Sequence, residues 1–164
     1  HSARIYRIAY QLKTCSAILY NHESPRRSTN FVTMKIARAV ARIKKGLQKE
    51  LVLGSLTGRR DWGWAPDYVE GMWMMLQAPT VDDFVFATGE LHSVEEFTRI
   101  AFSHLNLNWR DHVKQDPGLL VTVEPIAPCG NAGKAKRVLG WETTVSFEEL
   151  VVRMVESEVR NLEN

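Results

Sequence analysis

Apolar residues recur along this chain in two patterns, one with helical spacing and one of short continuous runs. Helical spacing predicts helices over residues 4–12, 32–47, 66–77, 93–105, 131–139 and 146–162. Short apolar runs are typical of buried strands and predict strands at 17–20, 51–53, 84–87 and 119–123. Polar loops are expected at 21–30 and 106–118. Because helices and strands alternate, the predicted fold class is α/β.

Local signals support several of these helices. Serine followed three residues later by glutamate, at Ser93 and again at Ser146, is the pattern of a capping box. Gly140 is expected to end the helix before it. Trp73 and Trp141 are expected in the core. In the predicted helix at 66–77, the apolar side chains expected to point into the core are those of Val69, Met72, Trp73 and Leu76.

The amino-acid composition excludes several classes of protein. The chain has 164 residues, 45% hydrophobic and 24% charged, which predicts one globular domain over residues 1–164. No apolar run approaches the roughly 18 residues of a membrane span. Cys15 and Cys129 suggest neither a disulfide framework nor a metal cluster. With no signal-peptide pattern at the start, we expect a cytoplasmic protein without a bound metal.

Charge is distributed unevenly along the chain. Residues 1–60 hold 13 Lys/Arg and only two acids, Glu23 and Glu50, whereas residues 61–164 hold 8 Lys/Arg and 17 acids. The first part therefore carries a net charge of +11 and the second −9. This asymmetry indicates that the basic part meets an anion: a phosphate ligand, nucleic acid, or the acidic part of the same fold.

A polar segment follows the first predicted strand directly. Residues 21–27 supply an amide, an imidazole, a carboxylate and two guanidinium groups. Ligands of open α/β sheets bind at the carboxyl ends of strands, and guanidinium groups suit phosphate oxygens. Lys35, in the first turn of the next helix, and Arg60, after the second strand, extend the basic region and suggest a diphosphate site. Solvated surface charges remain an alternative for each group alone.

Motifs of complete enzymes are missing. The sequence has no Gly-rich dinucleotide loop, Walker loop, Gly-x-Ser-x-Gly elbow or His-Glu-x-x-His. No tyrosine is followed four residues later by lysine. We therefore predict no catalytic residue.

The segment Asn21-His-Glu-Ser-Pro-Arg-Arg27, with Asn-Phe-Val-Thr-x-Lys-Ile at 30–36, resembles the GDP-mannose 4,6-dehydratase family of extended short-chain dehydrogenases/reductases. Residues 106–118 match this family poorly. The resemblance continues at 60–63, 67–70, 72–73, 87–90, 92–94, 134–136, 139–141 and 146–150.

The resemblance implies that this chain corresponds to one part of a larger enzyme. Enzymes of this family use NADP to oxidise the sugar at C4, remove water across C5 and C6, and return the hydride at C6. Their Gly-rich loop, Ser/Thr-Glu pair and Tyr-x-x-x-Lys lie upstream of anything present here. The chain thus resembles the C-terminal substrate-binding part, with residues 1–20 as a remnant of the Rossmann half and 21–164 as the nucleotide-sugar-binding part. Dehydration by this chain alone is not expected, so its enzyme status stays open.

The same resemblance assigns individual residues. It places His22 and Arg27 on the NADP side, although NADP binding by this chain alone is not expected. The family's late Arg-Pro-x-Glu segment, which helps to hold GDP, has no counterpart between 123 and 134, and Met34 and Trp64 also depart from the family pattern. Substrate-binding roles fall to Asn21, Val32, Lys35 and Arg60.

Three functions remain open. The leading one is a GDP-mannose 4,6-dehydratase-like protein that binds GDP or GDP-mannose; the alternative is a stand-alone nucleotide-binding or oligomerising module. Nucleic-acid binding by the basic helix at 35–49 is disfavoured because that helix lacks interleaved aromatic residues. An apolar strand without the larger sheet seeks a partner, so we also expect a homo-oligomer.

Overall fold

The computed structural model describes residues 2–119 and 127–163 and has the predicted α/β class. Its helices are α1 (Ser2–Tyr10), α2 (Val32–Lys44), α3 (Ala65–Gln77), α4 (Val94–His104), α5 (Gly133–Leu139) and α6 (Phe147–Asn161). Its short strands are β1 (Ala17–Leu19), β2 (Asn21–Glu23), β3 (Leu51–Leu53), β4 (Arg59–Arg60), β5 (Trp62–Trp64), β6 (Phe84–Phe86), β7 (His92–Ser93) and β8 (Val113–Gln115). Two 3-10 turns, η1 (Trp109–Asp111) and η2 (Pro117–Leu119), flank β8.

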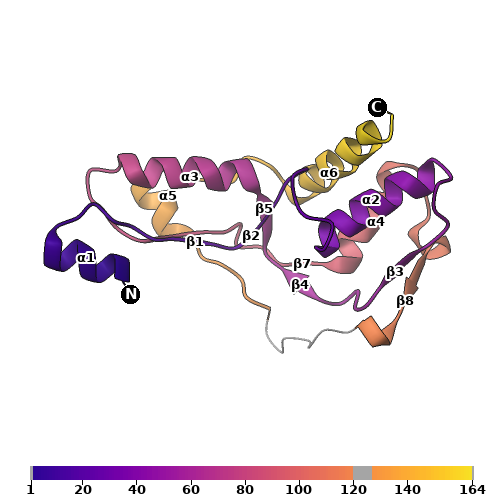
Figure 1. Ribbon diagram of the computed structural model, residues 1–164, viewed down its shortest axis with the longest axis horizontal. Coiled ribbons are helices and arrows are strands. Elements are labelled where there is room, and N and C mark those ends of the chain that lie inside the picture. The colour runs from indigo at the N-terminus through magenta and orange to yellow at the C-terminus, as the bar shows by residue number, and fades with distance from the viewer. Residues whose placement is uncertain (1, 120–126, 164) are drawn as a thin grey trace.

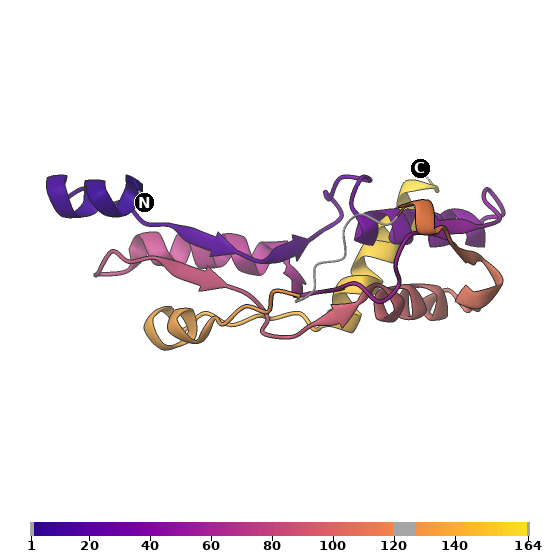
Figure 2. The same ribbon diagram turned by 90° about the horizontal axis from the view of Figure 1, so that it is seen from below.

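The molecule is elongated and has two regions (Figure 1). At one end, which we call the sheet region, α1, α3 and α5 lie around β1 and β6. At the other end, which we call the helical lobe, α2, α4 and α6 pack together beside β3 and β8. The β2–β5 and β4–β7 pairs lie between the two regions. The perpendicular view shows the same extended arrangement, with α1 at the far end from α6 (Figure 2).

Strand pairing connects segments that are distant in sequence. β1 pairs in parallel with β6, β2 with β5, and β3 with β8, whereas β4 and β7 are antiparallel. Tyr20 alone separates β1 from β2, so the chain leaves the sheet region and enters the middle of the molecule without a turn. This continuity places the polar segment after β1 beside β5.

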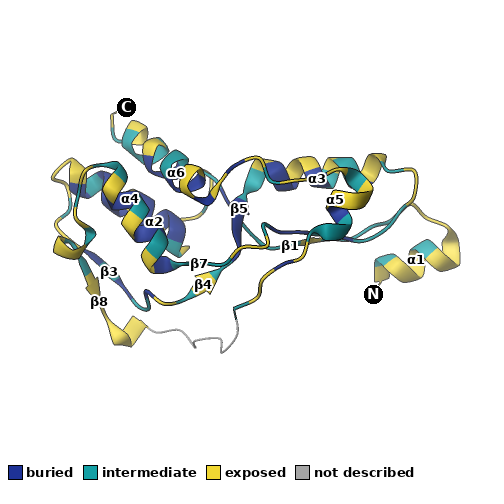
Figure 3. Ribbon diagram, turned by 180° about the vertical axis from the view of Figure 1, so that it is seen from behind, coloured by how far each residue is buried: buried dark blue, intermediate teal, exposed yellow. Residues whose placement is uncertain are grey.

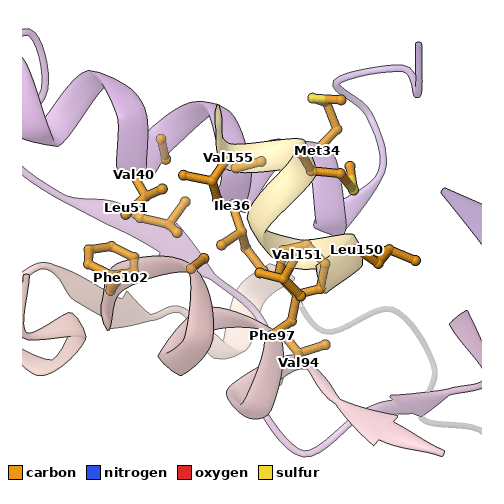
Figure 4. Packing of buried hydrophobic residues seen from close by; sticks show 14 of the residues in the cluster. Met34, Ile36, Val40, Leu51, Val94, Phe97, Phe102, Leu150, Val151 and Val155 are labelled. Atoms are coloured by element: carbon orange, nitrogen blue, oxygen red, sulfur yellow. The ribbon is translucent and has the colours of Figure 1, made fainter. Parts of the chain in front are cut away.

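The helical lobe has the larger hydrophobic core (Figure 4). The predicted stripe of α2 is buried at Ile36, Val40 and Ile43, but Leu47 lies beyond the helix and is exposed. Phe97 and Phe102 of α4 and Leu150 and Val155 of α6 complete the packing. The predicted capping box forms at Ser93, which accepts from Glu96 N–H. At Ser146 the structure shows the serine half of the predicted box, in which Ser146 accepts from Glu149 N–H.

The sheet region has a smaller core built on β6. Phe84 and Phe86 pack with Tyr68 and Met75 of α3 and with Trp141, which is buried as predicted. The indole N–H of Trp141 donates to the carbonyl of Asp67 at 2.7 Å. At Gly71 a Cβ atom would lie 2.4 Å from the ring of Phe86, so only glycine allows this close approach of α3 to β6.

The orientation predicted for α3 is wrong. Val69, Trp73 and Leu76 are exposed by 58%, 62% and 67%, and the inward face carries Asp67, Tyr68, Gly71 and Met75 instead. α3 is apolar on more than one side, so periodicity alone does not choose the buried face. Close packing on β6, which needs Gly71, decides it.

Several predicted boundaries also differ. The start of the predicted loop at 21–30 is β2, because its main chain pairs with β5. The predicted loop at 106–118 contains β8, which pairs with β3. Leu119 ends a 3-10 turn instead of opening a strand, and residues 120–123 lie outside the described residues. The first helix ends at Tyr10, before a left-handed Gln11 with φ +53°.

No helix among residues 2–119 and 127–163 is long and apolar enough to cross a membrane.

Candidate functional site

The middle of the molecule brings two of the predicted polar segments together. In the β2–β5 pair, Asn21 lies opposite Trp62 and His22 opposite Gly63. Arg60 ends β4, two residues before Trp62, and lies opposite His92 of β7. Asn21, His22 and Arg60 are all half-buried. The polar segment after β1 and the basic segment after β3 therefore meet across adjoining strands.

A buried carboxylate fixes the position of Arg60 in this arrangement. Asp61 is fully buried. Its Oδ1 atom accepts from the N–H and hydroxyl of Thr88 at 2.9 and 2.7 Å, and its Oδ2 atom accepts from the N–H groups of Gly89 and Gly130 at 3.0 and 3.1 Å. Four donors satisfy the carboxylate, as burial of a charge requires. Asp61 thus joins the start of β5 to the loop after β6 and to the segment at 130.

A second buried carboxylate, that of Glu23, contacts residues on both sides of the loop after β2. Glu23 is 1% exposed and accepts from the hydroxyl of Thr33 at 2.7 Å. Its Oε2 lies 3.3 Å from Nε of Arg27, and the guanidinium of Arg27 lies 3.5 Å from the ring centroid of Phe31. Burial raises the pKa of Glu23, although Thr33 and Arg27 act in the opposite direction. Glu23 therefore links β2 to the start of α2 and holds Arg27 in one orientation.

His22 is held by its neighbours. Its Nδ1 lies 2.8 Å from the carbonyl of Tyr20, which can only accept, so Nδ1 carries the proton. The imidazole ring packs against the ring of Tyr68, with centroids 5.3 Å apart. Tyr68 is fully buried, and its hydroxyl has no hydrogen-bond partner among the described residues. Burial, followed by Asp61 and Asp67, raises the pKa of Tyr68, so the phenol stays neutral.

Lys35 lies on the helical-lobe side of this centre. Its Nζ donates to the carbonyl of Val52 in β3 at 2.7 Å. An open cavity of about 580 Å³ is lined there by Lys35, Arg38, Arg42 and the edge of β3, which gives it basic walls. Val32 is half-buried against the core of the lobe. Both α2 residues therefore lie on the lobe, whereas Asn21, His22 and Arg60 lie on the strands between the regions.

Two residues that depart from the family pattern, Met34 and Trp64, contact other side chains of this chain. Met34 is 1% exposed in the core of the helical lobe, so it does not present its side chain to a ligand. Trp64 is half-buried, and the guanidinium of Arg153 lies 5.1 Å from its ring centroid. In the late stretch at 123–134, residues 123–126 lie outside the described residues.

Cys15 is half-buried and Cys129 exposed, and both are free. Within the described ranges, no three His, Cys, Asp or Glu residues are grouped closely enough to hold a metal ion.

Sequence reasoning missed the two carboxylates that organise the site. Glu23 was recognised as polar but not as a buried anchor, and Asp61 was not singled out. Their partners lie between 4 and 69 residues away along the chain. The available signal was an acid next to candidate binding residues directly after a strand, which does not reveal burial.

Comparison with known sequences identifies relatives over most of this chain. A family model described as GDP-mannose 4,6 dehydratase matches residues 1–154. GDP-mannose 4,6 dehydratase 2 of Arabidopsis thaliana is 54% identical over 154 residues, which are 94% of this chain and 41% of that protein. GDP-mannose 4,6 dehydratase of Homo sapiens is 43% identical, over 94% of this chain and 46% of that protein. The chain thus spans less than half the length of these relatives.

Solved structures give the same picture for the fold. RMD from Pseudomonas aeruginosa, complexed with NADPH, has a TM-score of 0.87 at 18% identity, over 98% of this chain and 52% of that chain. dTDP-glucose 4,6-dehydratase from Bacillus anthracis, in complex with NAD, has a TM-score of 0.82 at 21% identity, over 99% of this chain and 49% of that chain. The fold is therefore that of about half of an extended short-chain dehydrogenase/reductase, and this chain belongs to the GDP-mannose 4,6 dehydratase family.

Proposed function

We propose that this chain is the nucleotide-sugar-binding part of a GDP-mannose 4,6-dehydratase-like protein and that it binds GDP or GDP-mannose without catalysing dehydration by itself. One observation carries the proposal: the β2–β5 pairing aligns Asn21 with the segment that follows Arg60. Asn21 and Arg60 are two of the four residues to which the resemblance gives substrate-binding roles, and their two segments adjoin in space. The buried Asp61, fixed by four hydrogen bonds, holds this arrangement in place.

The charges near this centre suit a diphosphate. Arg60 brings a guanidinium group, which can form paired hydrogen bonds with phosphate oxygens. Lys35, Arg38 and Arg42 add positive charge along one face of α2. Val32, at the start of α2, offers an apolar contact beside that charge. We assign the diphosphate to Arg60 and the nucleoside to the α2 side.

Tyr68, the tyrosine beside this centre, does not fit the role of the base that dehydration needs. Oxidation at a sugar hydroxyl needs a group that removes its proton. Tyr68 is the tyrosine that packs against His22, but it is followed at the fourth position by Met72 and not by lysine. Its hydroxyl is buried, and its raised pKa keeps it protonated. Tyr68 is therefore suited to packing and not to proton transfer.

The residues assigned to NADP do not form a complete dinucleotide site. Nδ1 of His22 already donates to Tyr20, and Arg27 is held between Glu23 and Phe31. The sequence also has no Gly-rich loop for a pyrophosphate. We therefore do not propose NADP binding by this chain alone.

The test is calorimetric titration of the chain with GDP and GDP-mannose, with UDP and ADP as controls for the base. We expect saturable binding that prefers the guanine nucleotides. Arg60→Ala should raise Kd by about tenfold or more, because a hydrogen bond to a charged group contributes roughly 1.5–3 kcal/mol. Arg137→Ala, an exposed arginine on α5, is the matched control and should leave Kd unchanged.

Three results would contradict the proposal. No binding at millimolar GDP would favour a module that keeps the fold without a ligand. Equal losses in Arg60→Ala and Arg137→Ala would show that only the overall charge attracts the nucleotide. Steeply salt-dependent binding to duplex DNA of arbitrary sequence would instead favour a nucleic-acid partner.

A further inference from the structure

One side of α2 carries three cations that acidic side chains of the chain do not neutralise. Lys35, Arg38 and Arg42 are spaced by three and four residues, so they lie on the same side of the helix. Figure 3 shows that α2 has both buried and exposed residues along its length; Lys35 and Arg38 are exposed and Arg42 is half-buried. Within residues 2–119 and 127–163, no ion pair includes any of the three. On this side of α2, the basic part of the sequence is therefore not balanced by the acidic part.

The three cations line the open cavity between α2 and the edge of β3. Its volume of about 580 Å³ is in the range of small-molecule sites. Among the described residues in its lining, Glu50 is the one acid, and its carboxylate is paired with Lys114 of β8. The cavity therefore presents net positive charge to a ligand.

Hydrogen bonds hold the walls of this cavity in place. Gln48 Oε1 accepts from Nε of Arg42 at 3.3 Å, and Gln48 Nε2 donates to the carbonyl of Glu50 at 2.7 Å. At the other end, Lys35 donates to the carbonyl of Val52. Arg38 lies between Lys35 and Arg42 and forms no hydrogen bond or ion pair with another described residue. Its guanidinium, with five N–H donors, is thus available to a ligand between two anchored cations.

The nucleotide proposed above does not account for this charge. We assigned its diphosphate to Arg60, which does not line the cavity, and its nucleoside to the α2 side. A nucleoside is uncharged at neutral pH, whereas like charges three and four residues apart on a helix repel each other. A further anion beside α2 would remove this repulsion. The resemblance gives a substrate role to Lys35 but none to Arg38 or Arg42.

We propose that the cavity beside α2 is a second anion site, in which Arg38 and Arg42 bind a phosphate group distinct from the diphosphate at Arg60. The two arginines are about 6 Å apart along the helix axis, so their guanidinium groups can donate to one phosphate. The phosphate is carried by the ribose of the same nucleotide or by a separate phosphorylated small molecule. Only the first of these sources rests on the proposed function.

Calorimetric titration with three ligands tests this site: GDP, guanosine 5′-diphosphate 3′-diphosphate and inorganic pyrophosphate. The two nucleotides differ only in the 3′-diphosphate, so the ratio of their Kd values reports on a second anion. Pyrophosphate is titrated into the chain alone and into the chain saturated with GDP. The test variant is Arg38→Gln/Arg42→Gln, which removes two charges but keeps long, helix-forming side chains. Arg99→Gln/Arg137→Gln removes two charges from exposed positions of α4 and α5 and is the matched control.

We expect the 3′-diphosphate to lower Kd by about tenfold or more in wild type and in the control, because hydrogen bonds between charged groups are strong. In Arg38→Gln/Arg42→Gln this gain should disappear. Its Kd for GDP should stay within about twofold of wild type, because Arg60 lies outside the cavity. Equal Kd values for the two nucleotides, with pyrophosphate binding that only Arg38→Gln/Arg42→Gln abolishes, would assign the site to a separate phosphorylated molecule.

Two outcomes would overturn the proposal. One is that neither the 3′-diphosphate nor pyrophosphate loses affinity in Arg38→Gln/Arg42→Gln. The other is an equal loss in the control variant, which would show that only the total charge attracts the anion. Failure of GDP to bind would contradict the proposed function alone, because pyrophosphate tests the cavity without a nucleoside.

Discussion

The helical lobe and the sheet region bury their apolar residues to very different extents. In the lobe, α2, α4 and α6 turn their apolar sides toward one another and enclose a continuous core. In the sheet region, one side of α3 packs on β6 together with Ala135 and Trp141, whereas α1 and the outer stripe of α3 remain exposed. The lobe therefore encloses a core that stabilises it, whereas the sheet region leaves much of its apolar surface in contact with water.

The two regions also differ in what holds their outer elements. α6 contributes Leu150, Val151 and Met154 to the core of the lobe. α1 is held by the ion pairs of Arg7 with Asp82 and Asp83, and Lys134 also binds Asp82. The hydrogen bond from Lys134 lowers the pKa of Asp82. Ion pairs near the surface contribute little, so the attachment of α1 is weaker than that of α6.

The sharpest test of this difference is a cavity in the core of the lobe. Phe97 is fully buried between the helices, with its ring 5.9 Å from that of Trp62. We expect Phe97→Ala to lower the free energy of unfolding by about 3–5 kcal/mol, because apolar contacts are lost and a cavity remains. Urea unfolding followed by circular dichroism measures the change. Leu47→Ala, at an exposed position, is the control and should change stability by at most about 0.5 kcal/mol.

A smaller effect is expected at the tight contact inside the sheet region. In Gly71→Ala the new Cβ would lie 2.4 Å from the ring of Phe86 and 2.9 Å from Nε1 of Trp141. We expect a loss of about 1–3 kcal/mol, since α3 must move away from β6. Near-ultraviolet circular dichroism should also change, because Trp141 packs at this contact. Gly46→Ala is unsuitable as a control because Gly46 has φ +72°, whereas Gly58→Ala, with its nearest neighbour at 4.0 Å, is suitable.

The sequence predicted the lobe better than the sheet region. Periodicity identified α2, α4 and α6 because each has one apolar side and buries it locally. The same periodicity failed for α3, since its exposed stripe of Val69, Trp73 and Leu76 is as apolar as its buried face. Strands β1, β3 and β6 are only three residues long but were predicted because each is a continuous apolar run. Strands β2 and β8 contain polar residues and β5 contains Gly63, so none of the three gives that signal. Pairing between distant segments defines those strands.

The candidate site shows a similar division. The segments that hold Asn21, His22 and Arg60 follow predicted strands, and the resemblance to the family assigns roles to these residues. The structure places the segments together. Their supporting residues could not be predicted: Asp61 is stabilised by donors from loops at 88–89 and 130. Burial of a carboxylate depends on where those donors lie in the fold, and a single sequence does not contain that information. The binding roles themselves stay predictions.

The buried carboxylate between the two regions gives a pH-dependent test. Burial raises the pKa of Glu23 above its usual 4.5, so the folded state binds more protons than the unfolded state above that pH. The stabilising contribution of the protonated carboxyl is complete below pH 4.5 and is lost as pH rises through the folded pKa. Glu23→Gln cannot ionise. We therefore expect its stability to rise relative to wild type as pH increases from 4 to 7, by at most about 1.4 kcal/mol per pH unit.

Chemical unfolding at several pH values measures this difference. Glu148→Gln, at an exposed position in the first turn of α6, is the control. The contrary result is that the free energies of unfolding of wild type and Glu23→Gln differ by the same amount at every pH. Glu23 would then have the same pKa in the folded and unfolded states, and its role would be limited to the contacts with Thr33 and Arg27.

The smallest effect is expected on the exposed side of the sheet region. Trp73 is 62% exposed on α3, so Trp73→Ala should change the stability of this chain by no more than about 0.5 kcal/mol, despite the size of the side chain. Thermal unfolding of the two proteins at matched concentration measures the change. If the larger side chain were covered by a second copy, the loss would grow with protein concentration, because association stabilises the folded state by mass action. A concentration-independent loss of several kcal/mol would instead place Trp73 in a closed core. Either result would remove the contrast between the two regions, because the sheet region would then enclose its apolar residues as the helical lobe does.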